Sequence, residues 1–550
     1  MGLVILIAVF LNILGNAFYT QIDLTEEKRF TLTPATKKLL KEVDDVITVK
    51  VLFEGEFPAG MKRLQRAVRE SLNNFRSKTG YLEYEFVDPY AGDQEEVNAM
   101  IEELRKDGIV PVNLRFVDVD GTTEVFGYPY AIFYYKGRQL PVNFLETVNG
   151  VHPEKNLENS ISLLEYKFAN AIQKLQSSNR KNILFTVGHG ELKGYQTVDI
   201  RQTLQTFYNV DTINLDSVYA LPTEDVHALV IAKPQQTIPE KHKFIIDQYI
   251  MNGGKVLWLI DRLNAGLDSM SYQNQYIPLE YQLNIDDMLF EYGVRINPNL
   301  VLDLQCSSIP QVIDAQGNIS MFKWYYHPVI TPRSDHPVAK SVGNINLFFP
   351  ASIDTVRTKN PIKKTVLLES SEYSRLQFSP VRLDFEILRY DPEPDKFNKP
   401  HQPVAVLLEG AFSSLYENRL SKAQQTTLNQ LGQAFKATGT PTKMLVVSDG
   451  DIAKNLISRD GTYRPLGYNQ YERKVFMGNK DFLINAIEYL VDDNGIIEAR
   501  GKVVKSRLLN VVKARAEKAK WQMLNILLPL LFLGAFGFLY LWRRKKKYAA

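Results

Sequence analysis

The two ends of the chain carry its longest uncharged runs, and shorter apolar runs alternate with amphipathic segments between them. Residues 523–542 read MLNILLPLLFLGAFGFLYLW, and a helix of this length crosses the ~30 Å hydrocarbon core of a bilayer. A basic run at 543–547 follows at once. We predict a transmembrane helix over 523–543 and a basic cytoplasmic tail over 544–550.

The N-terminal run, residues 2–19, is also uncharged but shorter, and it has two interpretations. It predicts a transmembrane anchor over 1–20, because no basic residues precede it. A cleaved signal peptide is the alternative, since Gly15-Asn16-Ala17 fits a cleavage site. In both cases the segment sends the following chain across a membrane. We therefore expect a large external domain between two transmembrane helices.

Residues 21–150 alternate between strand and helix patterns, after a helix start at Thr33-Pro34. The β-α-β-α-β-β order is typical of a thioredoxin-like α/β domain. Redox chemistry in that fold needs a Cys-x-x-Cys pair after the first strand, and the turn at 54–58 reads EGEFP. We therefore expect no thiol chemistry there. The predicted strands are 47–53, 81–87, 112–117, 124–135 and 138–144, and the predicted helices are 61–78 and 95–106.

Residues 151–498 form the second predicted domain. Its apolar runs are typical of buried strands in a parallel sheet, as in a doubly wound, glutamine-amidotransferase-like α/β domain. Catalysis in that class needs a cysteine on a glycine elbow. The single cysteine, Cys306, has no such elbow, so we predict that it is a small apolar filler. The predicted strands are 182–188, 228–234, 255–261, 404–410 and 443–451, and the predicted helices are 159–176, 240–251 (ended by Gly253-Gly254) and 481–491.

The best candidate for a binding site in this domain is Gly188-His189-Gly190-Glu191. Ligands of doubly wound sheets bind beyond the carboxyl ends of the strands, and Asp261 ends another strand there. His189 and Glu191 offer groups for proton transfer. The alternative interpretation is a turn that needs glycine dihedral angles.

Two further carboxylates, Asp449 and Asp451, follow the predicted strand at 443–451. The favoured interpretation is that Asp451 caps a helix over 452–457. The alternative is that the two carboxylates offer ligands for a divalent cation.

Composition excludes several classes of function. The net charge of +3 gives no strong field for nucleic acid, so we expect no nucleic-acid partner. The seven histidines show no ligand spacing, and we expect no metal and no cofactor. The chain also lacks a Gly-x-x-x-x-Gly-Lys-Ser/Thr loop. Any ATP hydrolysis that it serves must come from another subunit.

The approach to the C-terminal anchor, residues 499–522, mixes apolar and basic residues and predicts an amphipathic juxtamembrane helix. Small residues in a membrane helix permit close packing against another helix, and an asparagine in lipid needs a hydrogen-bond partner. The predicted contacts with a membrane partner are Asn525, Pro529, Gly534 and Gly537.

Seven blocks of sequence resemble one known family. Together they make the chain similar to the gliding-motility-associated ABC transporter auxiliary (substrate-binding-type) protein GldG family. The blocks are DLTEEKRFTLTPAT (23–36), NILFTVGHGE (182–191), YIMNGGKVLWLID (249–261), NPNLVLDLQCSSIP (297–310), LLEGAFSSLYENR (407–419), SDGDIAKN (448–455) and GNKDFLINAIEYLVDDNGIIEARGK (478–502).

The resemblance implies a non-enzymatic accessory subunit in the inner membrane of gliding, Bacteroidetes-type bacteria, with the large domain in the periplasm. Its implied partners are an ABC permease subunit and a separate ATPase subunit, and its implied roles are gliding motility and secretion of surface proteins. The resemblance supplies no catalytic residue and no ligand. Two alternatives are a periplasmic solute-binding receptor that uses residues 188–191 and a degenerate amidotransferase-like hydrolase.

Overall fold

The computed structural model describes residues 31–118, 121–146, 153–177, 179–270, 275–430, 434–501, 513 and 516–548. The predicted anchor over 1–20 lies outside these residues, as does most of the predicted amphipathic helix over 499–522. The chain divides into two compact units, Met1–Val503 and Val504–Ala550. The first unit is mixed α/β, in agreement with the predicted class, and contains two parts that are each centred on a sheet.

The N-terminal part is built on a four-stranded sheet with the order β2-β1-β5-β6. β1 and β2 are parallel, whereas β5 is antiparallel to both β1 and β6. Helix α3 (Ala59–Arg76) packs into the same core because its large apolar residues recur every three or four positions and are all buried. The strands are β1 (Ile47–Val51), β2 (Leu82–Phe86), β5 (Tyr130–Tyr135) and β6 (Arg138–Asn143), and the other helices are α2 (Pro34–Lys41) and α4 (Gln94–Lys106).

One predicted strand in this part is two strands. Residues 124–135 divide into β5 and most of β4 (Gly121–Gly127), which pairs with β3 (Val112–Asp118) in a separate hairpin. The break falls at Pro129, which lacks the N–H that a continuous ladder needs. The order of the elements otherwise follows the prediction. Assignment to the thioredoxin-like class remains a prediction.

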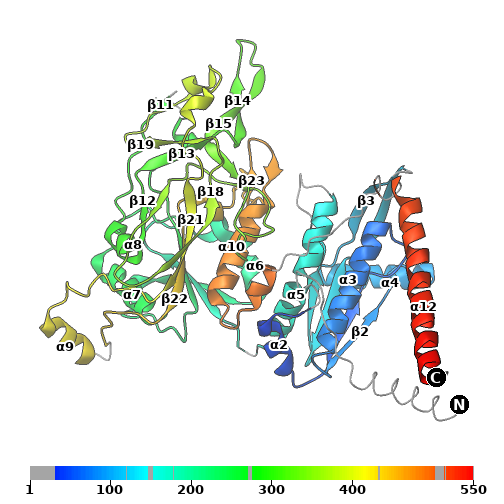
Figure 1. Ribbon diagram of the computed structural model, residues 1–550. Helices are drawn as coiled ribbons and strands as arrows, with labels where there is room; N and C mark the ends of the chain where they lie inside the picture. The colour runs from blue at the N-terminus through cyan, green and yellow to red at the C-terminus, as the bar shows by residue number, and fades with distance from the viewer. Residues whose placement is uncertain are drawn as a thin grey trace. The chain divides into compact units, whose positions relative to one another are not determined.

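The second part is built on a seven-stranded sheet with the order β18-β21-β22-β10-β9-β7-β8 (Figure 1). The five strands from β8 to β22 in this order are all parallel to their neighbours, as the doubly wound prediction requires. β21 is antiparallel to both of its neighbours, β22 and β18. The apolar pattern does not predict edge strand β8, whose sequence NVDTIN is polar. The strands are β7 (Asn182–Val187), β8 (Asn209–Asn214), β9 (Ala228–Ala232), β10 (Val256–Leu259), β18 (Lys363–Glu369), β21 (Pro403–Gly410) and β22 (Thr442–Val447).

Helices cover both faces of this sheet (Figure 1). Alternate residues of a strand point to opposite faces. Leu257 therefore packs into the core that contains α10, and Trp258 into the core that contains α7. All residues of β9 and β10 are buried, as expected for central parallel strands. The helices of this part are α6 (Val198–Gln205), α7 (Glu240–Met251), α8 (Asp286–Tyr292), α9 (Lys422–Gln430) and α10 (Met477–Val491).

Helix α7 ends where the sequence predicts, at the glycine pair that follows it. Gly253 has φ +95° and donates its N–H to the carbonyl of Ile250 (2.9 Å). Gly254 donates to the carbonyl of Tyr249 (2.8 Å). These two bonds form a Schellman motif, in which a left-handed glycine satisfies the last carbonyls of the helix.

The remaining strands form short sheets, mostly between β10 and β21 in the sequence. Their core includes the fully buried side chain of Trp324. These strands are β11 (Gln275–Tyr276), β12 (Val294–Ile296), β13 (Asn299–Asp303), β14 (Cys306–Val312), β15 (Ile319–Ile330), β16 (Ile345–Asn346), β17 (Ile353–Thr355), β19 (Ser374–Phe378), β20 (Leu383–Asp384), β23 (Tyr468–Asn469) and β24 (Lys474–Val475).

Helix α5 (Pro153–Gln176) joins the two parts of the first unit and begins earlier than the predicted 159. Glu488 of α10 is buried and accepts hydrogen bonds from Lys174 Nζ (2.6 Å) and from the Tyr166 hydroxyl, both on α5. Burial opposes ionisation of Glu488 most strongly, but the ammonium of Lys174 outweighs it and lowers the pKa of this carboxyl. The Glu488 contact therefore ties α5 to the seven-stranded sheet.

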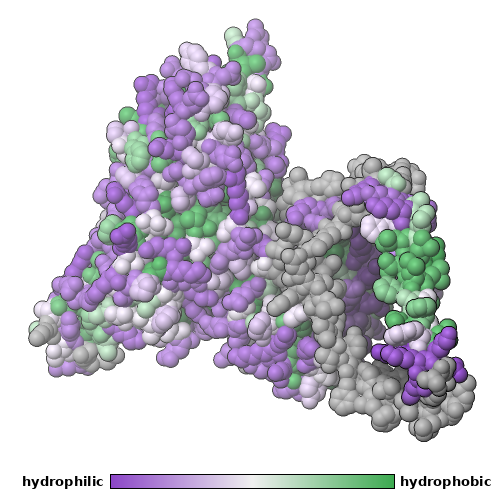
Figure 2. Space-filling model, in the orientation of Figure 1, coloured by the Kyte–Doolittle hydropathy of each residue, from purple (hydrophilic) through white to green (hydrophobic). Residues whose placement is uncertain are grey.

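The second unit contains one long apolar helix, α12 (Lys518–Tyr548). Within the described residues it is the one helix that is long and apolar enough to cross a membrane, and its most apolar stretch is not buried. Figure 2 shows a hydrophobic band along this helix that gives way to hydrophilic residues at its C-terminal end. The structure thus contains the predicted helix over 523–543, and the predicted first anchor lies outside the described residues.

Replacing Lys174 with Met should destabilise the protein, because it leaves the Glu488 carboxylate buried without its cation. We expect a loss of about 2 kcal/mol in the free energy of unfolding, below the full cost of breaking a buried pair because both side chains retain some exposure. Thermal unfolding of the full-length chain in detergent measures the change.

The matched control for this change is the double variant Lys174→Met/Glu488→Gln, which removes both charges and keeps an acceptor for Tyr166. It should recover most of the lost stability. Equal destabilisation of the single and double variants would contradict the assigned role of the ion pair.

Candidate functional site

The Gly-His-Gly-Glu turn after β7 needs its glycines for backbone reasons. Gly188 (φ +121°) and Gly190 (φ +78°) adopt left-handed conformations that other residues rarely tolerate. A Cβ on Gly190 would lie 3.1 Å from the Cβ of Gln235. The carbonyl of His189 accepts the backbone N–H of Gln235 (2.8 Å). The turn thus packs against the segment that follows β9.

The two chemical groups of this turn lie inside the protein, in a chain of four side chains. His189 Nδ1 lies 2.8 Å from Glu191 Oε1, and His189 Nε2 lies 2.8 Å from His242 Nδ1. His242 Nε2 in turn lies 2.9 Å from the exposed carboxylate of Asp216. Both rings are buried. Burial opposes ionisation of Glu191, but hydrogen bonds from His189 outweigh it and lower the pKa of this carboxyl.

The carboxylates at its two ends orient the two rings of this chain. His189 Nδ1 and His242 Nε2 face carboxylates, which accept hydrogen bonds, and the two inner nitrogens face one another. The sequence singles out His189 and Glu191 but not their partners, which come from α7 and from the turn after β8.

A second buried cluster surrounds the other predicted site residue, Asp261, at the same edge of the sheet. Lys233 Nζ lies 2.8 Å from Asp261 Oδ2 and 2.6 Å from Asp451 Oδ2. Burial disfavours the ammonium, but the two carboxylates outweigh burial and raise the pKa of Lys233. Gly450 fits here because a Cβ on it would lie 2.6 Å from the Cβ of Lys233. The amine is therefore held as a cation rather than as a free base.

The predicted helix cap at Asp451 is wrong. Asp451 begins a short 3-10 turn, η6 (Asp451–Ala453), whose N-cap is Gly450, and its carboxylate is paired with Lys233. Neighbouring Asp449 is fully buried, and burial together with the nearby carboxylates raises its pKa well above the usual range. Among the residues that the structure describes, no group of three or more His, Cys, Asp or Glu side chains could hold a metal ion.

His327 is a buried histidine that feels the charge of Asp451, a member of the same cluster. Its ring is fully buried, and neither ring nitrogen has a hydrogen-bond partner in the described part of the chain. The rings of Phe348 and Phe349 pack edge-on against it at centroid distances of 4.7 and 5.0 Å. Burial lowers the pKa of His327 to about 3, against a weaker upward effect of Asp451.

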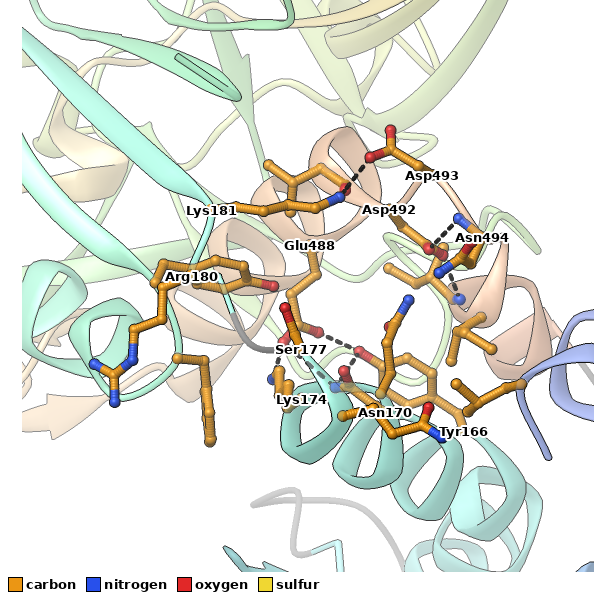
Figure 3. Close-up of a pocket in the computed structure, with 18 of the residues that line it drawn as sticks. Tyr166, Asn170, Lys174, Ser177, Arg180, Lys181, Glu488, Asp492, Asp493 and Asn494 are labelled. Carbon is orange, nitrogen blue, oxygen red and sulfur yellow. Dashed lines mark hydrogen bonds and ion pairs between the residues drawn. The ribbon is translucent and has the colours of Figure 1, made fainter. Parts of the chain in front are cut away.

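A cavity of about 420 Å³ lies at the opposite, amino-terminal edge of the sheet. Lys181 and Tyr208 stand directly before β7 and β8 and line it. Figure 3 shows Tyr166, Asn170 and Lys174 of α5 pointing towards Glu488 on the other side. Apolar strand patterns did not indicate this cavity, because its residues come from helix ends and loops. The local sequence signal for the cavity is the polar residue directly before each of two strands, Lys181 before β7 and Tyr208 before β8.

Cys306 does not form a catalytic constellation. The thiol is half-buried at the start of β14, and its Sγ lies 3.8 Å from the carbonyl of Leu304. Burial raises the pKa of Cys306 to about 12. A thiol that stays protonated at neutral pH is a poor nucleophile.

Comparison with known families places the chain. A family model described as "ABC-type uncharacterized transport system" matches residues 180–486, more than half of the chain, and the chain belongs to this family. A second model, "Domain of unknown function (DUF7088)", matches residues 26–134. The protein is therefore an auxiliary protein of an ABC-type transport system, and the family implies association with transporter components. The narrower GldG family is not established by these matches.

Related sequences and structures add little beyond the family. The chain is 21% identical over 521 residues to an "Uncharacterized protein" of Borreliella burgdorferi, covering 90% of this chain and 94% of the relative. The mmIFT52 N-terminal domain has a TM-score of 0.32 at 12% identity, with 56% of this chain and 97% of that chain covered. A ThuA-like protein from Parabacteroides merdae has a TM-score of 0.25 at 14% identity, with 60% and 93% covered. Neither structural likeness supports an argument about function.

Cys306 should react slowly with thiol reagents in the folded protein. Because burial keeps the thiol protonated, we expect labelling by iodoacetamide at neutral pH to be about a thousandfold slower than in the urea-unfolded chain. The single cysteine makes the assay specific, and the Cys306→Ala variant gives the blank. Labelling of the folded protein at the unfolded rate would restore the nucleophile interpretation.

Stability should fall at acid pH because of His327. The unfolded chain takes up a proton on this ring below about pH 6.5, whereas the folded chain does so only near its pKa of about 3. The free energy of unfolding should therefore decrease as the pH falls from neutral towards about 3, by about 3 kcal/mol at pH ~4.5.

Thermal unfolding of the His327→Phe variant across this pH range isolates the effect, since other groups titrate equally in both proteins. The variant should lose stability less steeply than the wild type. His401→Asn, at an exposed histidine with positive φ, is the matched control and should follow the wild-type slope. Parallel curves for wild type and His327→Phe would contradict the prediction.

Proposed function

We propose that the protein is a non-enzymatic accessory subunit of an inner-membrane ABC transporter, anchored by α12. The exposed apolar surface of α12 carries this proposal, because an apolar helix with no buried face needs lipid or another membrane helix around it. The basic run at 543–547 favours a cytoplasmic C-terminus, with the large α/β unit in the periplasm. The predicted anchor over 1–20 would make the protein cross the membrane twice.

The proposed partners are an ABC permease subunit, which α12 contacts, and a separate ATPase subunit. Gly534 and Gly537 support the permease contact, since a Cβ on either would meet no atom within 4 Å among the described residues of α12. Their spacing places them on one face of the helix. Asn525 lies nine residues before Gly534 and faces the other way, so it would mark a separate contact, and Pro529 lies between them.

The finer role that we propose is support of gliding motility and of surface-protein secretion. It rests on the resemblance of the sequence blocks to the GldG family. A hydrolase role has less support, because Cys306 lacks a base and stays protonated, and Lys233 is held by two carboxylates. Co-purification of the full-length chain from native membranes identifies the subunits that it binds.

Replacing both Gly534 and Gly537 with Leu should release the protein from its membrane complex. A Cβ at either position meets nothing within 4 Å among the described residues of α12, so we expect the loss to come from a partner helix that packs on this face. We expect the amount of co-purified permease and ATPase to fall about tenfold. Quantitative mass spectrometry of the tagged full-length protein, pulled from solubilised membranes, measures it.

The matched control is Ala535→Leu, which places a leucine roughly 100° and 200° around the helix from the two glycines. It should leave co-purification unchanged. Wild-type recovery of both subunits by the double-leucine variant would overturn the docking proposal.

A further inference from the structure

The cavity at the amino-terminal edge has the size and position of a small-molecule site. Helix α5 forms one wall, and the end of α10 with the turn after it forms the other (Figure 3). Its volume of about 420 Å³ falls within the range of ligand pockets, roughly 300–1,000 Å³. Such pockets are frequent where two structural parts of a chain meet.

The charged groups that line this cavity are balanced in sign, and half of them form two ion pairs with one another. Lys174 is bound to Glu488, and Lys181 Nζ lies 2.5 Å from Asp493 Oδ2. The carboxylate of Asp492 accepts three backbone N–H groups. Arg138 donates to carbonyls at the end of α5. The remaining two, Glu42 and Arg180, are exposed.

Apart from the exposed Glu42 and Arg180, the side chains that the cavity leaves open are neutral. Gln173, Asn494 and Tyr208 line it, and their side chains make no hydrogen bond to the described part of the chain. A side-chain amide both donates and accepts, and so does a phenol hydroxyl. The ring of Tyr208 adds an apolar face beside these groups.

We propose that this cavity binds a neutral, polyhydroxylated solute, such as a mono- or disaccharide. Sugar hydroxyls both donate and accept, which matches the open amides and the Tyr208 hydroxyl. A charged ligand would find no unpaired buried counter-charge and would have to displace an internal ion pair. The inference gives the proposed accessory subunit a ligand, and it requires neither the permease nor the membrane contact of α12.

Calorimetric titration of the purified full-length chain tests the proposal, in a detergent without a sugar headgroup so that the micelle does not compete. Glucose and maltose are the neutral probes, and glucose 6-phosphate and lysine are the charged ones. We expect the neutral sugars to bind about tenfold more tightly than either charged probe. Tyr208→Phe should weaken sugar binding about fivefold, because it removes one hydroxyl and keeps the ring.

The control variant Tyr390→Phe removes a hydroxyl from an exposed tyrosine away from the cavity and should bind sugar as the wild type does. Circular dichroism checks that both variants fold. The proposal fails if neither sugar binds at up to about 10 mM, if a charged probe binds as tightly, or if Tyr208→Phe has no effect. Each outcome is independent of co-purification with the transporter, so the two proposals can fail separately.

Discussion

The first unit depends on one buried carboxylate, Glu488, where its two parts meet. A carboxylate loses its hydration when it is buried, and it remains ionised only if the protein supplies equivalent partners. Here α5 supplies both the Lys174 ammonium and the Tyr166 hydroxyl, and the Lys174 ammonium also lies 3.9 Å above the ring of Phe207. The same contact that joins the two parts also forms a wall of the amino-edge cavity. The residues that join the two parts of the unit therefore also line the cavity.

The two edges of the seven-stranded sheet use their polar groups differently. At the carboxyl edge, Lys233 is buried and bonded to its two carboxylates, and His189 is buried and bonded to His242. At the amino edge, two ion pairs form, but neutral amides and a hydroxyl remain open beside about 420 Å³ of space. Doubly wound sheets commonly bind ligands at the carboxyl edge. In this protein that edge is filled by its own side chains.

The sequence predicts helices and strands well where the hydrophobic periodicity is strong. It predicts them poorly where contacts between distant segments of the chain determine the structure. The apolar strand β9 and the amphipathic helix α7 follow the predicted ranges closely, because hydrophobic patterning is local. Strand β8 is polar, and it forms because β7 offers it a free edge. The site behaves in the same way. His189 is visible beside a strand-end glycine, but its partner His242 lies 53 residues away and is brought near by the fold.

The closed carboxyl edge also bears on which function is physically reasonable. For a ligand to enter there, the Lys233 ammonium would have to leave at least one of its two carboxylates. Breaking a buried ion pair typically costs about 3–5 kcal/mol, a large fraction of the 5–15 kcal/mol that stabilises a folded domain. The amino-edge cavity already exists and needs no such opening. Recognition at the amino edge and anchoring through α12 therefore both leave the Lys233 cluster intact, whereas chemistry that used Asp261 or Asp451 as a free carboxylate would require its disruption.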